Sequence, residues 1–174
     1  MAWTIDASHS HIGFAVRHMV VSTVRGQFNA VRGTLNLDEA NPAASSVEAE
    51  VDAASIDTHD GNRDGHLRSA DFFDVEKFPT ITFKSTKVEN SDGDYKVTGD
   101  FTMHGVTKSV TFDVEYSGFV RDPYGLDRAG FSAQTKINRK DFGLTWGALL
   151  ETGGAVLSDE VKLNLEFEAT QQPA

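Results

Sequence analysis

The stretch "DGNRDGHLRSAD", residues 60–71, has the residue types and the spacing of a calcium-binding EF-hand loop. Asp60, Asn62 and Asp64 occupy the first, third and fifth positions, where such a loop carries oxygen ligands. A glycine stands at the sixth position and a carboxylate, Asp71, at the twelfth. If these residues act together, the expected chemistry is binding of Ca²⁺ through carboxylate and amide oxygens.

The residues around this stretch argue against a calcium site. An EF-hand loop lies between two amphipathic helices, whereas the preceding residues, "VEAEVDAASIDTH", alternate as a strand does. Asp71 is one methylene shorter than the Glu that usually binds the ion through both oxygens. Arg63 and Arg68 also add positive charge beside the ion's expected place. We therefore predict no metal in this stretch.

Residues 60–76 are better interpreted as a short helix. Thr58 or Asp60 can cap its first turn, and Asp64 and Arg68 are four residues apart, the spacing of an ion pair on a helix surface.

The histidines are the other candidate metal ligands. His59 and His66 lie seven residues apart with an arginine between them, and His9, His11 and His18 flank the first long strand. No pair has a zinc-type spacing with a third defined ligand. We interpret them as hydrogen-bonded side chains at the ends of elements, and we predict no metal ligand among them.

Catalytic motifs are equally scarce. The chain has no Cys, which excludes a thiolate nucleophile, a disulfide and any cysteine-based metal centre. It has no Gly-x-Ser-x-Gly elbow either. We assign no catalytic residue and no cofactor, and expect no enzyme. The alternative is a metal-dependent or enzymatic module that uses the His and Asp side chains of residues 59–71.

Composition limits the fold and the partners. At 174 residues, with 39% hydrophobic residues and twelve Phe, the chain is expected to form a single domain over residues 1–174. A formal net charge of -10 disfavours nucleic acid and anionic membranes as partners, because both would be repelled.

The start of the chain bears on localisation. "MAWTIDASHSHIGF" has neither the basic start nor the apolar centre of a signal peptide, and no run in the sequence is long enough to span a bilayer. We therefore expect a cytoplasmic protein without stable membrane insertion.

The elements that must position these residues are mostly strands. Apolar and polar residues alternate with period two over most of the chain, as in strands with one buried face. The segments with this pattern lie near residues 11–18, 24–37, 46–53, 80–89, 95–103, 110–118, 129–138 and 161–169. "NSDGD" and "HGVTK" have the Gly residues of hairpin turns. About eight consecutive antiparallel strands predict an all-β sandwich or barrel.

The inner faces of these strands combine large and small residues. The large ones are Phe14, Phe83, Phe101, Phe112, Phe131 and Phe167, and the small ones are Ala49, Ala53, Gly99 and Ala133. These residues could pack a solid core, as in a plain interaction domain, or line a tunnel. Residues 139–155 form a long apolar connection with Phe142 and Trp146, which we expect to cover part of the interior.

Several stretches in the same order resemble the YceI-like family of lipocalin-like, polyisoprenoid-binding proteins. The matching stretches are "SHSHIGFAVRHM", "RDGHLRSADFFDVEKFPTITFKS", "VTGDFTMHGVTKSVTFDV", "INRKDFGLTW" and "LSDEVKLNLEFE". Together they extend from Ser8 to Glu168.

This resemblance implies an antiparallel eight-stranded lipocalin-like barrel with a short helix between strands and an internal apolar pocket. It implies a long-chain ligand, such as a polyisoprenoid, an isoprenoid quinone or a fatty-acyl derivative, held for transport, storage or sequestration. It also allows a homodimer. On this basis we expect an apolar pocket lined by Phe14, Ala49, Phe83, Phe101, Phe112, Phe131, Phe142, Trp146 and Phe167.

Overall fold

The computed structural model of the chain describes residues 2–18, 21–91, 93–145 and 157–171. Within these residues the chain is mostly strand. The strands are β1 (Ala2–His18), β2 (Ser22–Phe28), β3 (Val31–Asn36), β4 (Ser46–Asp52), β5 (Ile56–Asp57), β6 (Thr80–Ser91), β7 (Asp94–Met103), β8 (Val106–Arg121), β9 (Asp127–Asn138) and β10 (Leu157–Gln171). The helices are η1 (Pro42–Ala44), η2 (Ala53–Ser55), α1 (Gly61–Arg68) and η3 (Arg139–Phe142).

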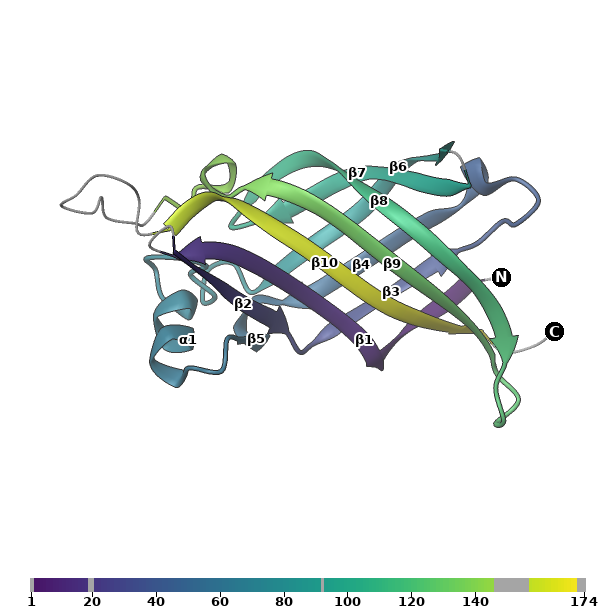
Figure 1. Ribbon diagram of the computed structural model, residues 1–174, viewed down its shortest axis with the longest axis horizontal. Coiled ribbons are helices and arrows are strands. Elements are labelled where there is room, and N and C mark those ends of the chain that lie inside the picture. Colours follow the sequence, from purple (N-terminus) through teal and green to yellow (C-terminus); the bar gives the residue numbers. More distant parts are fainter. Residues whose placement is uncertain (1, 19–20, 92, 146–156, 172–174) are drawn as a thin grey trace.

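Eight of these strands close into an antiparallel barrel (Figure 1). The order around the barrel is β1-β10-β9-β8-β7-β6-β4-β3, and the pairing of β3 and of β10 with β1 closes it. β2 pairs with the second half of β1, and β5 pairs with β2. The expectation of an all-β, eight-stranded antiparallel barrel with one short helix is confirmed. α1 lies at one end of the barrel, and both chain termini lie at the other (Figure 1).

The first strand is longer than the alternation predicted. β1 begins at Ala2, well before residue 11, and its pairing with β10 shifts between Asp6 and His11. A bulge of this kind adds residues to one strand and bends it, which also breaks the period-two pattern in the sequence. Before the bulge β1 pairs with β3, and after it with β2.

The prediction of one continuous strand over residues 24–37 is wrong. β2 ends at Phe28 and β3 begins at Val31, and between them the backbone N–H of Asn29 donates to the Ser55 carbonyl at 3.2 Å. The interruption follows from the bend in β1, because the two pieces pair with different halves of that strand.

The predicted hairpin at "HGVTK" is confirmed. β7 ends at Met103 and β8 begins at Val106, so the turn consists of His104 and Gly105. Their φ angles are +55° and +75°. Positive φ at both central residues is the requirement of a type I′ turn, whose twist matches that of the flanking strands.

The helix is shorter than predicted for residues 60–76. α1 ends at Arg68, where the N–H of Ser69 donates to the His66 carbonyl at 3.1 Å. Of the two predicted caps, Asp60 is the one used: its Oδ1 accepts the backbone N–H groups of Asn62 and Arg63, each at 3.1 Å.

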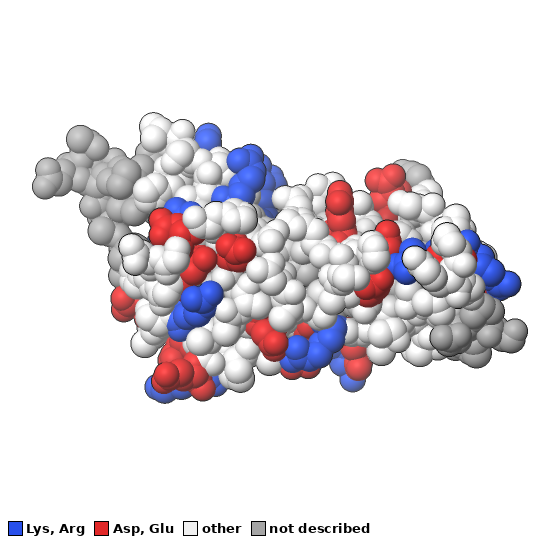
Figure 2. All heavy atoms as spheres, turned by 90° about the horizontal axis from the view of Figure 1, so that it is seen from below, with Lys and Arg blue, Asp and Glu red and all other residues white. Residues whose placement is uncertain are grey.

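The outer surface carries charges of both signs. On the face seen in Figure 2, acidic and basic side chains are interspersed between wide uncharged areas. Such a face lacks the continuous basic strip by which proteins follow a phosphate backbone. None of the helices within the described ranges is both long enough and apolar enough to cross a membrane.

Candidate ligand-binding cavity

The barrel encloses a cavity of about 680 Å³. Strand alternation builds its wall: on β10, for example, Val161, Leu163, Leu165 and Phe167 all face it. The volume lies within the range of roughly 300–1,000 Å³ that is usual for small-molecule sites. The interior therefore contains an open space and is not uniformly packed.

Most of the residues predicted to line a pocket lie on this wall. They are Phe14, Ala49, Phe83, Phe101, Phe112, Phe131 and Phe167. They come from β1, β4, β6, β7, β8, β9 and β10, so residues far apart in sequence meet around one space.

The two remaining predicted residues belong to the connection after β9. Phe142 is 2% exposed but does not lie on the cavity wall. Its ring packs against Phe101, with centroids 5.4 Å apart, and thus supports the wall from behind. Trp146 lies outside the described residues.

The small residues have two different roles. Ala49 and Ala133 face the cavity and leave room in it. Gly99 does not: a Cβ there would lie 2.6 Å from Cζ of Phe83, whose ring packs over the glycine. Ala53, predicted as part of a strand face, belongs to η2, is 1% exposed and lies away from the cavity wall.

The cavity ends in an aromatic stack toward the chain termini. Phe131 lies between Tyr116 and Phe167, with centroid distances of 5.1 and 4.9 Å and near-parallel rings. Beyond this stack, Ala129 and Ala169 are fully buried and no longer face the cavity. Beyond the stack, β9 and β10 are therefore closely packed at these two alanines.

Polar groups on the cavity wall cluster at its two ends. At the end covered by α1 the wall includes His18, Thr58, Arg63, His66 and Arg139. At the opposite end it includes Asn36, Asp38, Glu39, Ser45, Ser46, Tyr95 and Tyr116. The hydroxyl of Tyr116 donates to Oε1 of Glu39 at 3.0 Å, and burial together with that carboxylate raises the pKa of Tyr116 to about 12.

Arg139 is a cavity residue that sequence reasoning missed. Its side chain is 5% exposed, and it donates from Nε to the Ser158 carbonyl at 3.0 Å and from Nη1 to the Leu144 carbonyl at 2.7 Å. Burial lowers the pKa of its guanidinium, which still stays cationic at any ordinary pH. In the sequence it resembles any surface arginine, because its partners are backbone carbonyls, which no side-chain pattern reveals.

The carboxylates of the calcium-like stretch are engaged with the protein itself. Asp60 caps α1, and Asp64 accepts the backbone N–H of Thr58 at 3.0 Å. Asp71 contacts Nε2 of His66 at 2.9 Å. The predicted ion pair between Asp64 and Arg68 is wrong, since Arg68 donates to the carbonyls of Ala54 and Ile56. The element before this stretch is β5 and not a helix.

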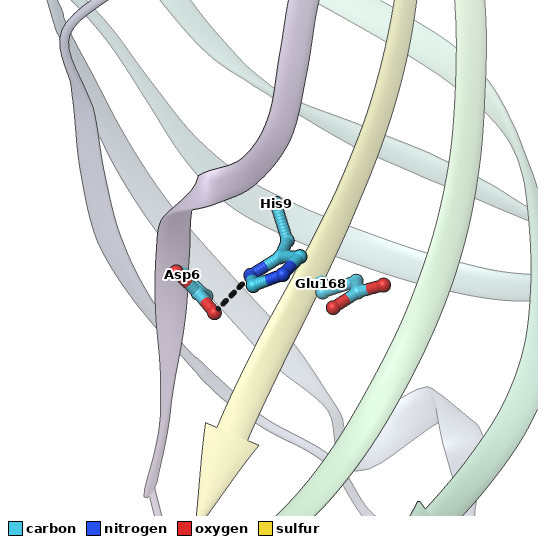
Figure 3. A group of neighbouring side chains, drawn as sticks. All are labelled: Asp6, His9 and Glu168. Carbon is cyan, nitrogen blue, oxygen red and sulfur yellow. Dashed lines mark hydrogen bonds and ion pairs between the residues drawn. The ribbon is translucent and has the colours of Figure 1, made fainter.

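A second group of potential metal ligands lies on the outside of the barrel. Asp6, His9 and Glu168 bring their ligand atoms within 4.8 Å of one another (Figure 3). Arg128 already fills the position of a cation there: Nη1 lies 2.7 Å from Oδ2 of Asp6 and 2.8 Å from Oε2 of Glu168. Its hydrogen bond is the main reason why the pKa of Asp6 falls far below its usual range.

Arg128 therefore joins three neighbouring strands. It lies on β9, Asp6 on β1 and Glu168 on β10, and a further contact of 3.1 Å reaches Asp122 in the β8–β9 turn. We call Arg128 together with Asp6, Asp122 and Glu168 the Arg128 clamp. It lies on the outside of the barrel, where β1 pairs with β10, beside the β1 bulge. Sequence reasoning missed it because its members are up to 162 positions apart, as Asp6 and Glu168 are.

Comparison with known proteins adds a family and a set of structural neighbours. The family model for the YceI-like domain matches residues 3–169. Protein YceI of Escherichia coli is 40% identical over 167 residues, which cover 96% of this chain and 84% of that protein. BcnA of Burkholderia cenocepacia superposes with a TM-score of 0.83 at 24% identity, over 94% of this chain and 98% of BcnA. A polyisoprenoid binding domain from Saccharophagus degradans superposes with a TM-score of 0.71 at 16% identity, over 98% of each chain.

Proposed function

Because the chain belongs to the YceI-like domain family, we propose that its barrel binds one long apolar chain, for transport, storage or sequestration. The candidate ligands are a polyisoprenoid, an isoprenoid quinone and a fatty-acyl derivative. The observation that carries the proposal is the cavity of about 680 Å³, with aromatic and aliphatic residues along its length and polar groups at its ends.

The shape of the cavity suits a chain better than a compact ligand. The wall follows β10 from Leu157 to Phe167. With a rise of about 3.3 Å per residue and a strand tilt of about 40°, this stretch extends over roughly 25 Å of the barrel axis. Each buried methylene would contribute about 0.8 kcal/mol, so affinity should grow with chain length. A structural neighbour is named a polyisoprenoid binding domain, which supports the same class of ligand.

We assign contact with the ligand to the aromatic and small residues of the wall. Phe14, Ala49, Phe83, Phe101, Phe112, Phe131 and Phe167 would contact the chain directly. Phe142 would act indirectly by holding Phe101. We propose binding without catalysis, since Asp60, Asp64 and the pair of His66 and Asp71 form hydrogen bonds within and around α1.

Uptake of defined lipids tests this function. Protein depleted of co-purified lipid on a hydrophobic resin is mixed with alcohols or fatty acids of increasing chain length, and binding is measured by calorimetry. We expect saturable binding at one site, with affinity that rises with chain length until the cavity is filled. Absence of binding for every length and headgroup would overturn the proposal.

A further inference from the structure

The charged groups of the cavity wall are separated by sign along its axis. Among the described residues, the cationic side chains on the wall, Arg63 and Arg139, lie at the α1 end, together with His18 and His66. The carboxylates on the wall, Asp38 and Glu39, lie at the opposite end. A long ligand that reaches both ends would meet potentials of opposite sign there.

Arg63 is held in a defined orientation at the α1 end. Its Nε donates to Oγ1 of Thr58 and its Nη2 to the Thr58 carbonyl, both at 2.8 Å. His66, one helical turn later, packs edge-on against Phe72 with centroids 5.2 Å apart. Two contacts to one residue fix the plane of the guanidinium, which lowers the entropic cost of ordering it around a ligand.

Two carboxylates near this end lie behind the wall. Asp64 is 6% exposed and bonds to Thr58, and Asp71 contacts His66, but neither faces the cavity. They reduce the positive potential without presenting an oxygen to the ligand. Arg139 adds a second fixed guanidinium in surroundings where water screens charge poorly.

The opposite end suits an anion badly. Glu39 is fixed by the hydroxyl of Tyr116, and Oδ1 of Asp38 accepts the backbone N–H of Asn41 at 2.9 Å. Both carboxylates are thereby held near the wall, where they repel negative charge.

We propose that the ligand is an amphiphile with a compact anionic headgroup, such as a carboxylate or a phosphate, bound at the α1 end beside Arg63. Its apolar tail then runs along the cavity to the stack of Tyr116, Phe131 and Phe167. This inference rests on the proposed function and adds the charge and the direction of the ligand. Charge-assisted hydrogen bonds from a guanidinium to such oxygens are among the strongest in proteins.

Ligands with matched tails test the inference. Binding of dodecanoate, dodecyl phosphate and dodecanol to the lipid-depleted protein is measured by calorimetry at one ionic strength. We expect at least one of the two anions to bind about tenfold more tightly than the alcohol. Arg63→Gln should remove most of this difference and leave binding of dodecanol unchanged.

Arg32→Gln is the matched control. It removes the same charge from the outside of the barrel, where Arg32 pairs with Glu50 at 2.7 Å, and should keep the preference for the anion. Equal affinity of all three ligands for the unchanged protein would overturn the headgroup inference and leave the carrier function standing. Failure of all three to bind would instead overturn the carrier function. If Arg63→Gln does not fold, the comparison of anions with alcohol on the unchanged protein still tests the charge of the headgroup.

Discussion

Residue size along the inner faces determines where the barrel has space. Ala49 faces the cavity between Gly33 on β3 and Phe83 on β6, its partners across the two neighbouring strands. Ala53, four residues later, is equally small but completely packed. The sequence shows two similar alanines, and only the end of β4 at Asp52 separates their roles.

Ala49→Trp therefore tests the space directly. The indole should enter the cavity, with a change in unfolding free energy below about 1 kcal/mol, while the amount of bound lipid falls sharply. Ala53→Trp is the matched control: it has no space to enter and should cost about 1–3 kcal/mol or more. Denaturation curves of the lipid-depleted proteins give the unfolding free energies, and lipid quantification gives the amount of bound lipid. Equal, large losses of stability at the two sites would show that the cavity cannot accept a side chain.

At the level of elements, α1 and the barrel closure are held by different polar contacts. Asp60 caps α1 through two backbone N–H groups, whereas Arg128 holds three strands together through carboxylates. The cap could be foreseen, because its partners are two and three residues away. The Arg128 clamp could not, because its partners come from both ends of the chain.

Asp60→Ala should destabilise the protein by about 1 kcal/mol through loss of the helix cap. Millimolar calcium should not change the melting temperature of the unchanged protein or of the variant. If calcium bound to the folded state alone, it would raise the melting temperature. A thermal scan with and without calcium checks this. A calcium-dependent rise that disappears in Asp60→Ala would show that residues 60–71 bind the ion.

Arg128→Gln should make stability less dependent on pH. The pKa of Asp6 is lowered in the folded protein, so its contribution is present above its unfolded value of 3.8 and is lost as pH falls toward the lowered one. The variant should lose about 2 kcal/mol at pH 7, and this deficit should shrink below pH 3.8. Asp122 and Glu168 also contact Arg128, His9 contacts Asp6, and the lowered pKa of Asp122 acts in the same direction.

Denaturant unfolding at pH 7 and at pH 3 measures the two deficits. Arg32→Gln breaks the exposed ion pairs of Arg32 on β3 with Glu50 and Asp52 on β4; it serves as the control and should show a small deficit at neutral pH. A deficit in Arg128→Gln that is the same at both pH values would contradict the role given to Asp6.

Across the whole molecule, the alternation of apolar and polar residues predicts most of the strands and which side chains point inward, because every second residue of a barrel strand faces the interior. It failed where the backbone leaves that period, at the bulge after Asp6 and at the break after Phe28. Alternation also could not distinguish a residue on the cavity wall from one packed behind it, as Gly99 and Phe142 show. The distinction depends on which neighbouring ring covers the position.

The distribution of charge over the whole molecule explains why an apolar interior can coexist with a strongly acidic chain. The net charge of -10 resides mainly on the outside, whereas the cavity wall has aromatic and aliphatic residues along its length and charges at its two ends. An apolar space of this size gains free energy when a chain replaces the water or void inside it.

Native mass spectrometry of the protein purified from its host, followed by organic extraction, shows whether the barrel holds a lipid. We predict one long-chain lipid per chain, released on unfolding and identified in the extract. Well-folded protein whose mass equals that of the polypeptide alone, with no lipid in the extract, would contradict it.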